Sequence, residues 1–97
     1  MLEVYRQPLA VRDLLEIWGY IAEDSEMRAD AFIDKIEDIF ITLAKSPKVG
    51  RLRNDLSDGL RSFPIGNYAI FYLPIASKII IVRVLHSARD IDSEFFN

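Results

Sequence analysis

The sequence contains no cysteine, a single histidine, and only four glycines among its 97 residues. The absence of cysteine excludes disulfides, thiolate catalysis, iron–sulfur clusters and thiolate zinc sites. One histidine, His86, cannot form a histidine-rich metal site, and four scattered glycines cannot build a phosphate-binding loop. We therefore expect no metal and no cofactor.

Long apolar runs are absent as well. No stretch approaches the roughly 20 apolar residues needed to cross a bilayer. Glu3, Arg6 and Gln7 interrupt the first ten residues, so these lack the continuous apolar core of a secretory signal. These features predict a cytoplasmic protein with no membrane contact.

Positive charge is scarce and unevenly distributed. The net charge of −3 argues against a protein whose main work is to neutralise phosphates, and we expect no direct nucleic-acid binding by the chain alone. Residues 1–46 carry five Lys and Arg against ten Asp and Glu, whereas residues 47–97 carry seven against five. A surface for an anionic partner is therefore expected in the second half.

The length and the 51% hydrophobic content predict one domain spanning residues 1–97. Its expected fold is α+β, in the order β-α-α-β-β-β: a helical hairpin packed on a small antiparallel sheet, followed by a short C-terminal tail or helix. The predicted strands are 2–6, 60–65, 68–73 and 78–86; the predicted helices are 9–22 and 26–45, with a polar loop at 51–59.

Apolar spacing predicts which helix faces are buried. The apolar positions expected in the first helix are Val11, Leu14, Trp18 and Ile21. The second helix shows a clearer periodicity, at Ala29, Phe32, Ile33, Ile36, Phe40 and Leu43, and Ser25 is suited to cap its start. The two helices are joined by a few residues, so they should be antiparallel neighbours.

The last strand is apolar on both faces. Strict alternation places Ile80, Val82 and Val84 on one face and Ile79, Ile81 and Leu85 on the other. We expect the tail, through Phe95 and Phe96, or a partner to cover the second face. Arg83 interrupts this strand and requires either a partner or an exposed edge of the sheet. Asp90 could be that partner, unless Asp90 pairs with Arg89 instead.

The order of elements and several short motifs resemble the ParE/RelE superfamily of toxins from bacterial toxin–antitoxin pairs. The motifs are Asp13-Leu14, Ile17, Tyr20-Ile21, Ala31-Phe32, Ser46-Pro47 with Gly50, Gly59-Leu60-Arg61, Tyr68 to Tyr72, and Arg83 to Asp90. The last stretch resembles the ParE branch most closely. ParE-type members are described as poisons of DNA gyrase that act through protein contacts, whereas RelE-type members cleave messenger RNA in the ribosome.

The resemblance to the ParE branch implies a gyrase-poisoning toxin with no catalytic residues, neutralised by a cognate ParD-like antitoxin with which it forms a hetero-oligomer. The residues expected to meet the target are Arg61, Arg83, His86, Arg89 and Asp90. The acidic residues expected to meet basic groups of the antitoxin are Glu23, Asp30, Asp34 and Glu37.

Two alternatives remain open. A ribosome-dependent endonuclease would use Tyr72 and His86 for proton transfer and Arg61 and Arg83 to stabilise charge on phosphate. Arg83 and His86 are three residues apart, however, so a regular strand directs them to opposite faces. The second alternative is a non-toxic module that only binds an antitoxin.

Overall fold

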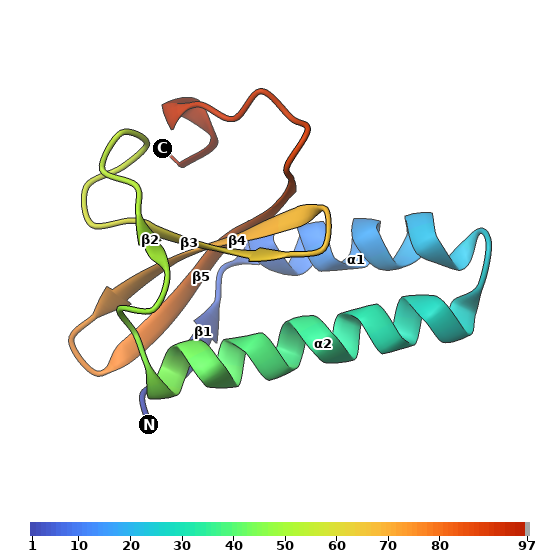
Figure 1. Ribbon diagram of the computed structural model, residues 1–97, viewed down its shortest axis with the longest axis horizontal. Coiled ribbons are helices and arrows are strands. Elements are labelled where there is room, and N and C mark those ends of the chain that lie inside the picture. Colours follow the sequence, from blue (N-terminus) through green and yellow to red (C-terminus); the bar gives the residue numbers. More distant parts are fainter. Residues whose placement is uncertain (97) are drawn as a thin grey trace.

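The structure is a computed structural model that describes residues 1–96. Its elements are β1 (Glu3–Arg6), α1 (Pro8–Ala22), α2 (Glu26–Lys45), β2 (Arg51–Leu52), β3 (Arg61–Ile65), β4 (Tyr68–Ile75), β5 (Lys78–His86) and a 3₁₀ turn, η1 (Ser93–Phe96). Figure 1 shows the two helices as an antiparallel hairpin beside the sheet, with the C-terminal tail away from them. The predicted α+β class and helical hairpin are confirmed. The last residue of the predicted domain, Asn97, lies outside the described range.

The sheet has five strands in the order β1-β5-β4-β3-β2. The meander β3-β4-β5 is antiparallel as predicted, and β1 joins β5 in parallel, so the sheet as a whole is mixed. Strand β2 forms inside the segment predicted as a loop, because Arg51 and Leu52 pair with Ser62 and Arg61 of β3. Strands β3 and β4 form a hairpin whose turn contains Gly66, and its φ of +55° lies in the left-handed region that favours glycine.

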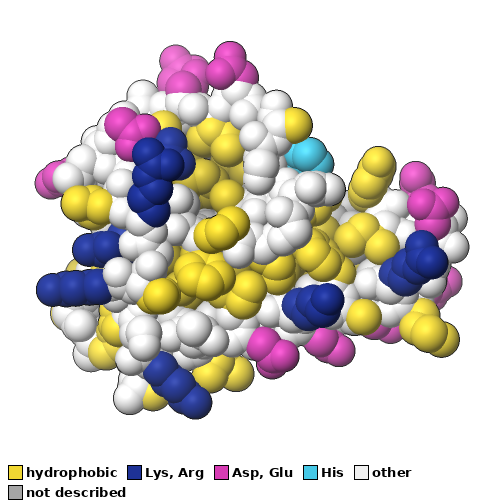
Figure 2. All heavy atoms as spheres, viewed as in Figure 1, with side chains coloured by type: hydrophobic (Ala, Val, Ile, Leu, Met, Phe, Trp, Pro, Cys, Tyr) yellow, Lys and Arg dark blue, Asp and Glu magenta, His cyan; other side chains and the backbone are white. Residues whose placement is uncertain are grey.

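Two apolar clusters fill the two faces of the sheet. The helix-side core consists of the buried residues Ala10, Leu14, Ile17, Ile36, Phe40, Leu43, Ala44, Ile65, Ile70, Tyr72, Ile79, Ile81 and Val84. The tail-side core consists of Leu56, Leu60, Phe71, Val82 and Leu85, with Ile91, Phe95 and Phe96 of the tail packed against them. The prediction that the tail covers the second face is confirmed. Figure 2 shows apolar side chains between this tail and the loop that precedes β3.

The predicted face assignment of β5 is wrong beyond Val82. Tyr72 pairs with Ile81 but Phe71 pairs with Arg83, so Val82 is an extra residue, a β-bulge. The bulge reverses the alternation: Val84 joins Ile79 and Ile81 in the helix-side core, and Leu85 joins Val82 in the tail-side core.

The helices follow their periodicity with one correction. All six predicted positions of α2 are buried or half-buried, and the Ser25 hydroxyl caps the helix by accepting from the Arg28 N–H at 3.2 Å. In α1 the buried residues are Ala10, Asp13, Leu14 and Ile17, whereas Val11 is exposed. The buried face is therefore rotated from the predicted one, and it includes a carboxylate.

Candidate functional site

The site begins where β1 ends. β1 pairs with β5 only as far as Arg6 opposite Ile81, so the remainder of β5 has a free edge on that side. Helix α1 lies beside this edge and places Asp13 against it. The Asp13 carboxylate accepts a hydrogen bond from the Val84 N–H at 3.0 Å. This bond replaces the one that a carbonyl of β1 would accept if β1 continued along the edge of β5.

Asp13 also holds Arg83. Its two carboxylate oxygens accept from Arg83 Nε at 2.8 Å and Nη2 at 2.9 Å, a bidentate pair between side chains that are only 7% and 14% exposed. The hydrogen bond that Arg83 donates to Asp13 raises the pKa of Arg83, which remains charged. The predicted partner Asp90 is therefore wrong, and no ion pair joins Arg89 to Asp90 within residues 1–96.

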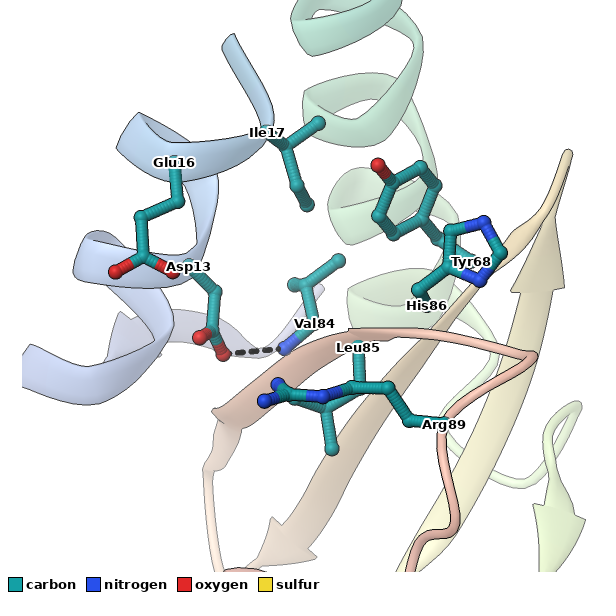
Figure 3. A pocket seen from close by; sticks show the side chains of 8 residues that line it. All are labelled: Asp13, Glu16, Ile17, Tyr68, Val84, Leu85, His86 and Arg89. Atoms are coloured by element: carbon teal, nitrogen blue, oxygen red, sulfur yellow. Dashed lines mark hydrogen bonds between the residues drawn. The ribbon is translucent and has the colours of Figure 1, made fainter. Parts of the chain in front are cut away.

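A cleft of about 300 Å³ opens next to this ion pair. Its lining combines α1, β4, the end of β5 and the loop that follows: Asp13, Glu16, Ile17, Tyr68, Val84, Leu85, His86 and Arg89. Figure 3 shows Asp13 and Glu16 projecting from α1 on one side, with Tyr68 and His86 on the other. The cleft brings together two of the predicted target residues, His86 and Arg89.

A hydrogen bond from the following loop sets the tautomer of the neutral His86 ring. Its Nδ1 accepts from the Ala88 N–H at 3.0 Å, so in the neutral ring the proton lies on Nε2. The ring stands edge-on to Tyr68, with centroids 5.0 Å apart. Use of Nε2 as a base would require the other tautomer and the loss of the bond to Ala88. His86 is therefore arranged as a hydrogen-bond donor.

The loop after β5 is fixed by its own backbone. Ser87 N–H donates to the Asn67 carbonyl at 2.7 Å, and Arg89 N–H donates to the His86 carbonyl at 3.1 Å. Arg89 and Asp90 are both exposed on this loop. The predicted residues His86, Arg89 and Asp90 thus lie together at the end of β5 and on the loop that follows it, and we call them the loop surface.

Tyr68 carries a phenol that stays protonated. Partial burial, with a smaller effect of Tyr20, raises the pKa of Tyr68 above its ordinary value. Its ring also contacts Phe32 of α2 at a centroid distance of 5.6 Å. Tyr68 therefore places a neutral hydroxyl in the cleft, on a ring that is attached to the sheet and packs against helix α2.

Tyr72 and Arg61 lie elsewhere. They are paired across β3 and β4, and Tyr72 is four residues along the strand from Tyr68, a separation of about 13 Å in an extended chain. Tyr72 is fully buried; its hydroxyl donates to the Pro47 carbonyl and accepts from the Gly50 N–H, both at 2.8 Å. Burial raises the pKa of this hydroxyl.

Arg61 supports the same turn. Its Nη1 donates to the carbonyls of Gly50 at 2.8 Å and Lys48 at 3.2 Å. Together with Tyr72 it fixes the chain between α2 and β2. Both side chains therefore have structural hydrogen bonds, away from the His86 cleft.

The expected opposition of Arg83 and His86 is confirmed. Arg83 lies opposite Phe71 of the tail-side core, whereas His86 lies opposite Tyr68 beside the helix-side core. The four residues of the nuclease hypothesis do not converge on one point. Within residues 1–96, no group of three or more His, Asp or Glu side chains is arranged to hold a metal ion.

The comparison with known families decides the identity. Residues 4–91 match the family model described as "ParE toxin of type II toxin-antitoxin system, parDE". The chain belongs to the ParE toxin family. It is accordingly the toxin of a ParDE type II toxin–antitoxin system, and a cognate ParD antitoxin is its partner.

Individual relatives agree with this assignment. The chain is 31% identical to "Toxin ParE3" of Caulobacter vibrioides over 74 residues, which are 75% of this chain and 74% of the relative. It is 28% identical to "Toxin ParE1" of Mycobacterium tuberculosis over 87 residues, 88% and 89% of the two chains.

A solved structure described as "Chromosomal ParDE TA system from P. aeruginosa" shares the fold. The TM-score is 0.75 at 18% identity, covering 89% of this chain and 96% of the other.

Neither helix within residues 1–96 combines the length and the apolar character that crossing a membrane requires.

The sequence motifs did not single out Asp13 as a partner of Arg83. One signal was present: Asp13 follows Ala10 by three residues and precedes Ile17 by four, which places it on the buried face of α1. A carboxylate in that position needs a cation, and Arg83 was the arginine in need of a partner.

Proposed function

We propose that this ParE-family toxin arrests growth by binding DNA gyrase through protein contacts and stabilising a cleaved or stalled enzyme–DNA state. The observation that carries the proposal is the placement of the potential catalytic groups. Tyr72 and Arg61 are engaged in one turn, Arg83 is paired with Asp13, and His86 Nδ1 is occupied by a backbone N–H. A phosphodiester-cleaving centre needs such groups to converge on one phosphate. Gyrase as the target rests on the ParE membership.

The surface that we assign to the target is the loop surface formed by His86, Arg89 and Asp90. Arg89 and Asp90 are the exposed members of the predicted set, and the half-buried His86 lines the cleft together with Arg89. Arg89 forms no ion pair with any of residues 1–96. Arg83 is half-buried and bonded to Asp13, which lines the same cleft as His86 and Arg89. Arg61, at the start of β3 and opposite Tyr72, is assigned to the fold rather than to the target contact.

The surface that we assign to the ParD antitoxin is an apolar groove on the helical hairpin. It is lined by Arg6, Val11, Leu14, Leu15, Trp18, Ile33 and Glu37, with a volume of about 280 Å³. An amphipathic segment of the antitoxin would bury these side chains. The groove lies apart from the loop surface, so the residues that bind the antitoxin are distinct from those assigned to the target.

The four predicted acidic antitoxin contacts have different environments. Glu37 lines the groove and pairs with Arg6, and Asp30 accepts from the Trp18 indole at 2.8 Å. Glu23 and Asp34 are exposed without an ion pair to residues 1–96. We assign all four to the electrostatic rim around the groove.

Two substitutions test the antitoxin surface. Leu15, 69% exposed, lines the groove, whereas Met27, 82% exposed, lies on the same hairpin outside it. Leu15→Glu should weaken antitoxin binding by about tenfold or more, the effect of a charge in an apolar interface centre. Met27→Glu should leave the affinity unchanged. Equal affinities of the two variants would overturn the assignment.

The target is tested by inducible expression in bacteria without the antitoxin. Growth arrest with gyrase covalently trapped on DNA and intact messenger RNA is expected, and co-expression of the cognate ParD should restore growth. Messenger cleavage with intact DNA would instead establish the RelE-type nuclease. Unimpaired growth despite tight antitoxin binding would establish a non-toxic binding module.

A further inference from the structure

The ring of Phe95 in the C-terminal tail is shared by two arginines. The guanidinium carbon of Arg83 lies 5.6 Å from the centre of this ring, and that of Arg89 lies 5.3 Å from it. These distances are in the range of cation–π contacts. The two arginines differ in every other contact they make.

Arg83 is anchored by its bidentate bond to Asp13. Arg89 is exposed, and its side chain makes no hydrogen bond or ion pair with any of residues 1–96. Phe95 is therefore the contact that orients the Arg89 guanidinium. An arginine side chain without such support would sample many rotamers, and binding would have to offset the entropy lost on ordering it.

The tail itself is seated by apolar packing. Ile91, Phe95 and Phe96 pack on the tail-side core, and the Phe96 ring contacts Phe71 at a centroid distance of 5.0 Å. The backbone N–H groups of η1 bond within the tail: Phe95 N–H donates to the Asp92 carbonyl, and Glu94 N–H donates to the Asp92 side chain at Oδ1. The tail thus has a second aromatic contact that holds it independently of the arginines.

A guanidinium over an aromatic ring can keep its N–H groups free for another partner. Because the five N–H donors of arginine lie in the plane of the group, contact with a ring face leaves them available to a planar acceptor such as a carboxylate. Arg89 has no carboxylate partner among residues 1–96. Its position over Phe95 and its free charge therefore suit a bidentate bond to an acidic side chain of another protein.

We propose that Phe95 is a positioning residue of the target surface, which holds Arg89 ready to bind an aspartate or glutamate side chain of the target protein. This inference rests on the proposed protein-contact function of the loop surface. It gives the tail a role in recognition in addition to covering the sheet.

The positioning is tested without any target by NMR. Protons above an aromatic face are shifted upfield by its ring current, so the Arg89 Cδ protons should be shifted upfield in the full chain. The shift should disappear in Phe95→Leu and persist in Phe95→Tyr and in Phe96→Leu. An unshifted Arg89 in the parent chain, or a shift that survives in Phe95→Leu, would overturn the inference.

The consequence for recognition is tested by toxin dose against growth in cells. Phe95→Leu should raise the dose needed for arrest about threefold to fivefold, the effect of losing one exposed cation–π contact. Phe95→Tyr should retain the parent dose. Phe96→Leu, which removes a similar tail aromatic without a cation contact, is the matched control and should remain near the parent.

The role of Arg89 itself is tested by Arg89→Ala and Arg89→Lys, which should both be weaker toxins than the Phe95→Leu variant, because lysine keeps the charge but not the planar fork. Antitoxin affinity, measured for every variant, reports that each is folded. Parent-like toxicity of Phe95→Leu, or equal losses in Phe95→Leu and Phe96→Leu, would contradict positioning by Phe95. Failure of the parent toxin to trap gyrase would contradict the proposed target. The NMR experiment would still test whether Phe95 positions Arg89, because it needs no target.

Discussion

Asp13 and Arg83, 70 residues apart in the sequence, form a bidentate ion pair that joins helix α1 to the free edge of strand β5. The same carboxylate accepts a hydrogen bond from the Val84 N–H. One side chain therefore satisfies a backbone donor at the strand edge and neutralises the charge of Arg83. Asp13 also lines the cleft that His86 and Arg89 share, so the ion pair links the stability of the fold to this cleft.

Asp13→Asn should destabilise the protein strongly. The substitution leaves the Arg83 guanidinium without its counter-charge in a site where it is only 14% exposed. Loss of one partner of a buried pair costs about 3–5 kcal/mol of unfolding free energy. Urea denaturation measures the change.

Glu16→Gln is the matched control for that experiment. Glu16 pairs with Arg12 on the same helix, but both side chains are well exposed. An exposed pair of this kind contributes at most about 0.5 kcal/mol. Similar losses for Asp13→Asn and Glu16→Gln would contradict the structural role of the Asp13–Arg83 pair.

Tyr72→Phe should lower stability without lowering the toxicity of the folded protein. The variant removes the hydroxyl that joins Pro47 to Gly50 and leaves two backbone groups without this partner, at a cost of about 1–3 kcal/mol. Denaturation and toxin dose are measured together. Abolished toxicity with unchanged stability would indicate a catalytic tyrosine and favour the nuclease alternative.

Alkaline pH should destabilise the protein through its buried phenols. Burial raises the pKa of Tyr72 and of Tyr68 above 10.0, so above that pH the unfolded chain loses these protons while the folded chain keeps them. Their contribution is therefore complete below pH 10.0 and is lost as the pH rises through the raised pKa values. Urea denaturation across this range should show the fall, and Tyr72→Phe should remove part of it. An equal fall in both proteins would exclude Tyr72 as a source.

Two glycines should respond in opposite ways to alanine. A Cβ at Gly50 would collide with the Tyr72 hydroxyl and lie 2.9 Å from the Ser62 carbonyl oxygen, so Gly50→Ala should cost about 1–3 kcal/mol. Gly19 lies at an exposed position of helix α1, with nothing within 4 Å of the added Cβ, so Gly19→Ala should add about 0.5–1 kcal/mol to the unfolding free energy. Thermal unfolding of the two variants checks the sign of each change.

Much of the fold could be predicted from local sequence patterns alone. The α2 periodicity and the Ser25 cap depend on neighbouring residues, and both are as predicted. The place of β1 was not predictable in this way. Its parallel pairing with β5 depends on a contact across the whole chain, which no local pattern encodes.

The site was predictable in part. The loop from His86 to Asp90 was identified from its motif, and His86 and Arg89 do line one cleft. The bulge at Val82 was not foreseen, because an apolar strand gives no signal of one extra residue, and every facing beyond it changed. The Asp13–Arg83 pair joins two residues whose separate positions were unusual but whose proximity only the fold determines.

The most direct test of the proposed function uses purified toxin, gyrase and plasmid DNA. Gyrase covalently trapped on cleaved DNA is measured with rising toxin, with and without an excess of the cognate ParD antitoxin. The account predicts trapping that rises with toxin, is abolished by ParD and is reduced in Arg89→Ala. Gyrase that stays fully active at toxin doses that arrest growth in cells would contradict it.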